Sequence, residues 1–262
     1  DGQTIHQENL YGRHVKKFST LPSDQIHQDG YWHVDRVINE IINTALDPVQ
    51  GPVHLNIPIR EPFYPEDSDE YLFKNNPKII DTPGNTGDLN NVKWDELKDI
   101  WNRSHHIMLV AGQTRLNSYL NKILNEFITK YRIPLLGDTI ANIHGMDNKN
   151  ITHHDLILGK NGVLKKMLQP DLLITFGNGV ISKNLKNFLR SANPAHHWDI
   201  REAGYHPDTF QCLSHRIRLK PDVFFQKGLG YFPENTRSSD YLNQWVLEEK
   251  NTEKKIPGFF DS

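Results

Sequence analysis

The chain has 262 residues and a formal net charge of −2, because 32 Asp and Glu nearly cancel 30 Lys and Arg. This balance argues against a nucleic-acid-binding protein, which normally carries a basic surplus. No apolar run reaches 18 residues, so we expect no membrane span. Hydrophobic residues make up 37% of the chain, and this content with a small net charge indicates a folded protein of one or two domains.

The single cysteine, Cys212, excludes an internal disulfide and a cysteine-based zinc site. This cysteine usage is typical of a reducing compartment, so we expect a cytoplasmic protein. The chain begins at Asp1 without a Met, a basic segment or an apolar signal sequence. We therefore expect it to be a piece of a longer protein.

Residues 1–65 predict one helix and one strand. Apolar residues recur at three- and four-residue spacing over 34–45, behind a capping Asp29, which is the pattern of a helix. The segment 51–58 alternates apolar and polar residues and ends at Pro58, as a strand does. One helix and one strand cannot build an independent core, so this zone is expected to be the end of a domain.

Residues 66–90 are rich in Pro, Asp, Asn and Gly, and we expect a linker there. Residues 91–230 alternate short apolar runs with helical patterns, which predicts βαβ units. The expected strands are 107–111, 133–136, 171–176, 196–200 and 217–219, and the expected helices centre on 94–101, 116–128 and 185–189. The fold class is therefore α/β, a Rossmann-like, doubly wound and mostly parallel sheet. A second linker with one helix near 241–247 is expected over 231–262.

The best candidate for a phosphate-binding loop is the segment Gly177–Lys183, which lies between a predicted strand and a predicted helix. Gly177 and Gly179 would let backbone N–H groups approach an anion, but Ser182 stands where a third glycine usually lies. Glycines in this place also serve simply to turn a strand into a helix. A nucleotide-binding module of the NAD or FAD type remains an alternative, and loss of binding in a Gly179→Val variant would support it.

Histidines occur in adjacent pairs, of which His105-His106 is the most interesting because it directly precedes a predicted strand. Adjacent strand residues face opposite sides of a sheet, so we expect no metal site from these pairs. Basic side chains at this position would line a cleft, and Arg115 follows the same strand. A further alternative is therefore a regulatory domain whose cleft near His105 and Arg115 senses an anionic metabolite.

Several strings, taken together, resemble one enzyme family. They lie at residues 2–12, at Gly51–Tyr64 with its Gly-Pro-Val-His-Leu-Asn-Ile-Pro-Ile-Arg-Glu-Pro run, and at 134–138, 153–158 and 171–183. The chain resembles the middle part of the 2-succinyl-5-enolpyruvyl-6-hydroxy-3-cyclohexene-1-carboxylate synthase family (MenD) of menaquinone biosynthesis. The resemblance extends from residue 1 to about residue 230.

This resemblance implies a three-domain, thiamin-diphosphate-dependent transferase that uses Mg²⁺ or Mn²⁺. The family decarboxylates 2-oxoglutarate and adds the resulting succinyl unit to isochorismate, with the cofactor supplying the difficult chemistry. The parent enzyme would be a homo-oligomer, since the cofactor of this superfamily lies between subunits. On this basis 1–65 is the C-terminal part of a pyrimidine-binding domain, 91–230 is the central Rossmann-like domain, and 231–262 leads to a pyrophosphate-binding domain.

The resemblance also implies which residues would contact substrate. Gln3 matches a family glutamine that reaches the active site, and His105-His106 stands where some members carry a basic pair. With Arg115 these form the predicted substrate-binding set. The activating glutamate would precede Asp1, and the metal-diphosphate motif that Gly137-Asp138-Thr139 begins has Leu164-Lys165 where Asn belongs. We therefore expect no catalytic residue, no bound cofactor and no activity in this chain alone.

Overall fold

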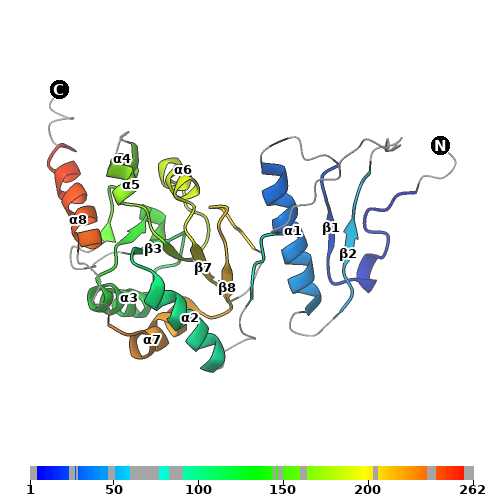
Figure 1. Cartoon of the computed structure of the whole chain (residues 1–262), viewed down its shortest axis with the longest axis horizontal. Helices are drawn as coiled ribbons and strands as arrows, with labels where there is room; N and C mark the ends of the chain where they lie inside the picture. The colour runs from blue at the N-terminus through cyan, green and yellow to red at the C-terminus, as the bar shows by residue number, and fades with distance from the viewer. Residues whose placement is uncertain are drawn as a thin grey trace. The chain divides into compact units, whose positions relative to one another are not determined.

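A computed structural model of the chain describes two compact units, Asp1–Ile80 and Asp81–Ser262 (Figure 1). The residues described are 5–23, 27, 29–46, 51–59, 77–82, 91–143, 146, 150–159, 164–202, 206–234 and 240–256. In the described ranges, no helix is both long and apolar enough to cross a membrane.

The first unit contains one long helix and one pair of parallel strands. Its elements are η1 (Gly12–His14), β1 (Phe18–Thr20), α1 (Asp29–Leu46) and β2 (His54–Asn56). The strands pair in register, with Phe18 opposite His54 and Thr20 opposite Asn56. The predicted helix and strand are thus both present, whereas β1 was not predicted because three residues carry too short a pattern to recognise.

A buried carboxylate joins α1 to the segment that leads into β1. Glu40 is only 6% exposed, and it accepts hydrogen bonds from Lys17 Nζ at 2.6 Å and from Arg36 Nη1 at 2.9 Å. Two cations therefore compensate one buried negative charge. The end of this unit is also held on α1, because Asn39 bonds the backbone of both Lys78 and Ile80.

The second unit is built on a parallel sheet of six strands. Its elements are α2 (Asn91–Arg103), β3 (Ile107–Ala111), α3 (Ser118–Tyr131), β4 (Leu135–Gly137), η2 (Thr139–Ala141), β5 (Asn150–Ile151), α4 (His154–Gly159), α5 (Leu164–Met167), β6 (Leu172–Phe176), α6 (Lys183–Ala192), β7 (His196–Ile200), β8 (His215–Ile217), α7 (Pro221–Tyr231) and α8 (Asp240–Glu253). The strand order is β5-β4-β3-β6-β7-β8 and every pair is parallel. This is the doubly wound order of a Rossmann fold, as the sequence predicts.

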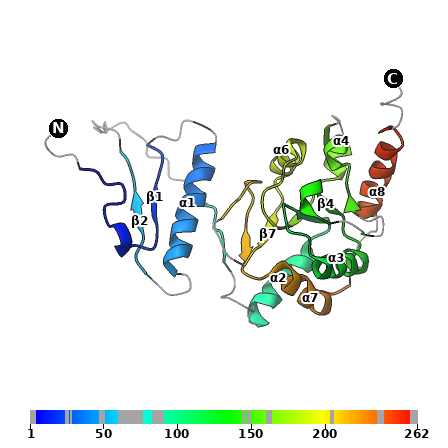
Figure 2. The same ribbon diagram turned by 180° about the vertical axis from the view of Figure 1, so that it is seen from behind.

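Two apolar layers cover the two faces of this sheet. Helices α2, α3 and α7 lie on one face, and α4, α6 and α8 lie on the other (Figures 1 and 2). Alternate residues of β3 face the two layers: Leu109 belongs to the first cluster, and Met108 and Val110 belong to the second. Because both faces are buried, the central strands are continuously apolar rather than alternating.

The C-terminal helix α8 belongs to the second apolar layer. Tyr241 and Trp245 are buried in that cluster, and the Tyr241 hydroxyl donates to the Leu168 carbonyl at 3.0 Å. Near the C-terminal end of α8, the Glu249 carboxylate accepts hydrogen bonds from Thr152 Oγ1 at 2.6 Å and from the His153 backbone N–H at 3.1 Å. The helix predicted near 241–247 is thus present, and it packs on the second unit.

Candidate functional site

The carboxyl edge of the sheet is the natural place to look for a site. β3 and β6 are neighbours, but the chain continues outward from β3 to β4 and from β6 to β7, in opposite directions. In doubly wound sheets ligands bind outside the strand ends at such a switch point, where the connecting loops separate. Here the two loops are those that follow Ala111 and Phe176.

These two loops are bonded directly to each other. Gly112 N donates to the Phe176 carbonyl at 2.8 Å, Gln113 N to Gly179 at 3.1 Å, and Asn178 N to Gln113 at 2.8 Å. Gly177 has φ +82°, and a Cβ there would lie 2.9 Å from the Gly112 carbonyl oxygen. Glycine is thus needed for a left-handed backbone in a close contact. The glycines of the predicted phosphate loop close the crevice between β3 and β6.

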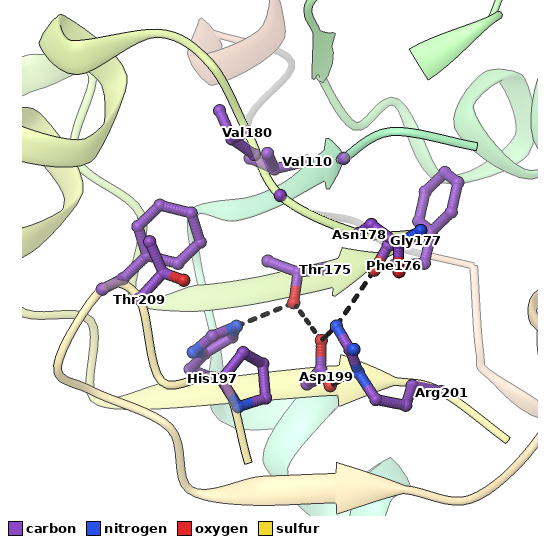
Figure 3. Close-up of a pocket in the computed structure, with 14 residues that line it drawn as sticks. Val110, Thr175, Phe176, Gly177, Asn178, Val180, His197, Asp199, Arg201 and Thr209 are labelled. Atoms are coloured by element: carbon purple, nitrogen blue, oxygen red, sulfur yellow. Dashed lines mark hydrogen bonds and ion pairs between the residues drawn. The ribbon is translucent and has the colours of Figure 1, made fainter. Parts of the chain in front are cut away.

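A chain of buried polar side chains lies beside these loops, on the ends of β6 and β7 (Figure 3). Thr175 Oγ1 donates to Asp199 Oδ1 at 3.0 Å and lies 2.9 Å from His197 Nε2. Because the threonine proton is given to Asp199, the histidine Nε2 carries a proton and donates to Thr175. Arg201 Nε donates to Asp199 Oδ2 at 2.6 Å, and Arg201 Nη2 donates to the Gly177 carbonyl at 3.0 Å.

This polar chain lines a pocket of about 130 Å³, together with Val110, Val180, Pro207, Thr209 and Phe210. Pockets for drug-sized ligands and cofactors measure roughly 300–1,000 Å³, so this one is too small for a dinucleotide or thiamin diphosphate. The Asp199 carboxylate accepts from the Thr175 hydroxyl and also forms an ion pair with Arg201. The arrangement therefore anchors the loop at Gly177 to β7 and presents one threonine, one histidine and one guanidinium to a small cavity.

The N-terminus of α6, where a phosphate was one of the predicted ligands, is bonded to the protein's own side chains. Ser182 is the N-cap, and its Oγ accepts from Leu185 N at 3.0 Å and donates to Asp155. Asp138 Oδ2 accepts from the N–H groups of Ile181 at 2.5 Å and Ser182 at 3.3 Å. Ser182 stands at the third glycine position because it caps the helix.

The structure separates the predicted substrate-binding residues. His105 and His106 precede β3, at the amino edge of the sheet, whereas Arg115 follows β3 and lies beyond the carboxyl edge. The expectation of one cleft near both His105 and Arg115 is therefore wrong, because the length of a strand separates them. Gln3 lies outside the described residues, so its predicted role stays a prediction.

At the amino edge, Asp171 holds the histidine pair through the backbone. Its two carboxylate oxygens accept from His105 N at 2.6 Å and His106 N at 2.9 Å. The His106 ring stacks on the buried Tyr241 ring with 4.5 Å between centroids. Both histidines are exposed, and their predicted contact with substrate stays a prediction. In the described part of the chain, no three His, Cys, Asp or Glu side chains are arranged to hold a metal ion.

Two further histidines on this edge predict a pH dependence of stability. Burial lowers the pKa of His215 below its ordinary value of 6.5, partly offset by Asp81, and burial likewise lowers the pKa of His196. Between the lowered pKa and 6.5 the unfolded chain binds more protons, so stability is highest above pH 6.5 and falls below it. We expect the melting temperature to fall on acidification, and to fall less in a His215→Gln variant, measured between about pH 5 and pH 8. Parallel curves for the two proteins would contradict this.

The polar chain predicts a measurable cost for removing one hydroxyl. Thr175→Val keeps the shape of the side chain but deprives both His197 and Asp199 of a partner. We expect the free energy of unfolding to fall by about 1–3 kcal/mol in urea denaturation. Thr209→Val, on the rim of the same pocket but outside this chain of hydrogen bonds, is the matched control and is expected to change stability by less than about 0.5 kcal/mol. Equal losses in the two variants would argue against the hydrogen-bond explanation.

One pattern in the sequence points to Thr175, His197, Asp199 and Arg201, but the prediction did not use it. His197, Asp199 and Arg201 stand two residues apart, so they share one face of β7 and its extension. Three polar side chains on one face of a buried strand need partners in the same layer. Thr175, directly opposite Asp199 in the register of β6 and β7, supplies one of them.

Comparison with known proteins shows the family. Residues 87–261 match the family described as "Middle domain of thiamine pyrophosphate". Three 2-succinyl-5-enolpyruvyl-6-hydroxy-3-cyclohexene-1-carboxylate synthases are similar over most of this chain. The one from Cytophaga hutchinsonii is 31% identical over 98% of this chain and 46% of its own length. The one from Desulfotalea psychrophila is 32% identical over 99% and 47%, and the one from Flavobacterium johnsoniae is 34% identical over 86% and 39%.

The chain therefore spans less than half the length of these relatives, while the alignments with the first two cover nearly all of its own residues. The family match covers the whole sheet of the second unit, and the doubly wound topology agrees with the fold that the resemblance implies. The chain belongs to the family of thiamine pyrophosphate enzyme middle domains and is a homologue of the 2-succinyl-5-enolpyruvyl-6-hydroxy-3-cyclohexene-1-carboxylate synthases.

Proposed function

We propose that this chain is the central part of a thiamin-diphosphate-dependent synthase that decarboxylates 2-oxoglutarate and adds the succinyl unit to isochorismate. The observation that carries the proposal is the alignment with relatives of that name over 98–99% of the chain, which includes both units. In this proposal residues 1–65 end a pyrimidine-binding domain and 91–230 form the central domain. The parent is proposed to be a cytoplasmic homo-oligomer in which Gln3, His105, His106 and Arg115 contact substrate.

The described residues do not fit a binding site for thiamin diphosphate and its metal ion. Asp138, which begins a partial match to the metal-diphosphate motif, is bonded to the backbone of Ile181 and Ser182. Leu164 and Lys165, at the spacing of the second motif residue, offer no oxygen ligand from their side chains. We therefore assign cofactor binding to the parts of the parent enzyme that this chain does not contain, and we expect the chain alone to be inactive.

The nucleotide-binding alternative receives no support from the geometry of its own loop. The N–H groups of Gly112, Gln113 and Asn178 donate to backbone carbonyls. Those of Ile181 and Ser182 donate to Asp138. A Cβ at Gly179 would meet nothing within 4 Å, so Gly179→Val is a mild change. Because the valine side chain at this position would begin in open space, the Gly179→Val variant is a weaker test of the alternative than the sequence suggests.

The experiment compares two proteins. One is the purified 262-residue chain, and the other is the product of the complete coding region that contains these residues. Both are assayed for consumption of isochorismate with 2-oxoglutarate, thiamin diphosphate and Mg²⁺. We expect turnover by the complete product, lost when thiamin diphosphate is omitted, and none by the chain alone. Turnover by the isolated chain, or an inactive complete product that binds thiamin diphosphate, would overturn the proposal.

A further inference from the structure

The N-terminus of α6 carries an anion that belongs to the protein itself. α6 is ten residues long, and the N–H groups just before it, those of Ile181 and Ser182, point at Asp138 Oδ2. Such N–H groups lack partners within their helix, and the helix dipole adds positive potential there. A phosphate takes this kind of position in nucleotide-binding sheets. Asp138 reaches it from the end of β4, two strands away from β6 in the sheet.

A buried histidine is aimed at the same place. His154 is only 2% exposed, and its Nδ1 lies 3.2 Å from the Ile151 carbonyl oxygen. A carbonyl only accepts, so Nδ1 carries the proton in that bond. The other nitrogen, Nε2, is buried without a hydrogen bond and lies 3.4 Å from Asp138 Oδ1. A buried polar atom without a hydrogen bond is unusual, and here it faces the carboxylate that accepts from Ile181 N and Ser182 N.

The neighbouring carboxylate, that of Asp155, bonds other groups of the protein. Asp155 accepts from the Ser182 hydroxyl and from Asn184 Nδ2 at 3.3 Å. It thereby joins α4 to the first turn of α6 and takes no hydrogen bond from Ile181 N or Ser182 N. Its negative charge lies beside the Asp138 position and limits how tightly another anion would bind there.

From these contacts we propose that the N-terminus of α6 is an oxyanion site whose resident ligand is the Asp138 carboxylate. Removing this carboxylate exposes the N–H groups of Ile181 and Ser182 to an oxyanion of the size of inorganic phosphate. An O–H group that such a phosphate keeps can donate to His154 Nε2, which is an acceptor when Nδ1 carries the proton. The crevice beyond remains closed, because Gly112 lies against the backbone of Asn178. The site therefore takes the phosphate alone, without a nucleoside.

The test is chemical rescue of the 262-residue chain. Asp138→Ala is expected to melt about 3–6 °C below the unsubstituted chain, the size of a lost helix cap in a domain of this length. Inorganic phosphate, titrated to about 50 mM at constant ionic strength, is expected to return about half of that loss, since a ligand that binds only the folded state stabilises it. The unsubstituted chain should shift much less. Equal shifts in both proteins would overturn the proposal.

Three further arms keep the result decisive. Asp138→Ser also removes the carboxylate from Ile181 N and Ser182 N, so it replaces the alanine variant if that one does not fold, and it should also respond to phosphate. Adding His154→Ala to either variant should reduce the phosphate response. ADP should stabilise the variants no more than pyrophosphate does. A larger effect of ADP would show that the crevice admits a nucleoside. It would contradict the statement that the site takes phosphate alone.

Discussion

Replacing Gly112 by alanine is expected to lower the free energy of unfolding of the second unit by about 3 kcal/mol or more. A Cβ at this position would lie 1.9 Å from the Asn178 carbonyl oxygen and 2.8 Å from its carbonyl carbon. These are backbone atoms, and Asn178 cannot move away freely because its N–H is bonded to Gln113. Relief of the clash therefore requires the two loops to separate.

The matched control is Gly179→Ala in the opposite loop. A Cβ at Gly179 meets nothing within 4 Å, so the change in stability is expected to stay within about 1 kcal/mol. Urea denaturation followed by circular dichroism measures both variants against the unsubstituted chain. Comparable losses at the two glycines would show that the loops are not packed together as described.

Removing the Trp245 side chain is expected to cost about 3–5 kcal/mol of stability, the range for a buried tryptophan replaced by alanine. Trp245 is fully buried and lies edge-on to Phe188 of α6, with 6.2 Å between ring centroids. The cavity would open between α6 and α8, in the second apolar layer. This variant therefore measures how firmly α8 belongs to the fold.

Leu247, two residues further on the same helix, is the comparison. Its side chain is 57% exposed, so Leu247→Ala is expected to change the free energy of unfolding by less than about 1 kcal/mol. Urea denaturation followed by circular dichroism again gives both values. If Trp245→Ala were as mild as Leu247→Ala, α8 would contribute little to the stability of the second unit.

The central strands were the easiest part of the fold to predict. β3 and β6 are runs of five residues with both faces buried, so their apolar character is almost continuous and their ends are sharp. β5 has two residues and α5 has four, and such short elements show no period. α7 was not predicted, although Phe224 and Phe225 are fully buried in it, because adjacent aromatic residues fit a strand as well as a helix.

The candidate site was predicted less well, for a physical reason. A sequence shows which glycines could cradle a phosphate, but not what already occupies the N–H groups around them. Asp138 is more than 40 residues from Ile181 and Ser182, and their contact depends on the order of the strands. The family resemblance, by contrast, rests on strings of adjacent residues, and the comparisons confirm it.

The anchoring of α8 has a consequence for the order in which the chain folds during synthesis. Glu249 bonds residues 97 positions earlier, and Tyr241 bonds Leu168, 73 positions earlier. Until these residues leave the ribosome, the apolar surface of α4 and α6 that Trp245 covers stays exposed to water. Nascent chains in that state are prone to aggregate and are typical clients of chaperones. The second unit therefore completes its folding late in its own translation, after all six strands have been synthesised.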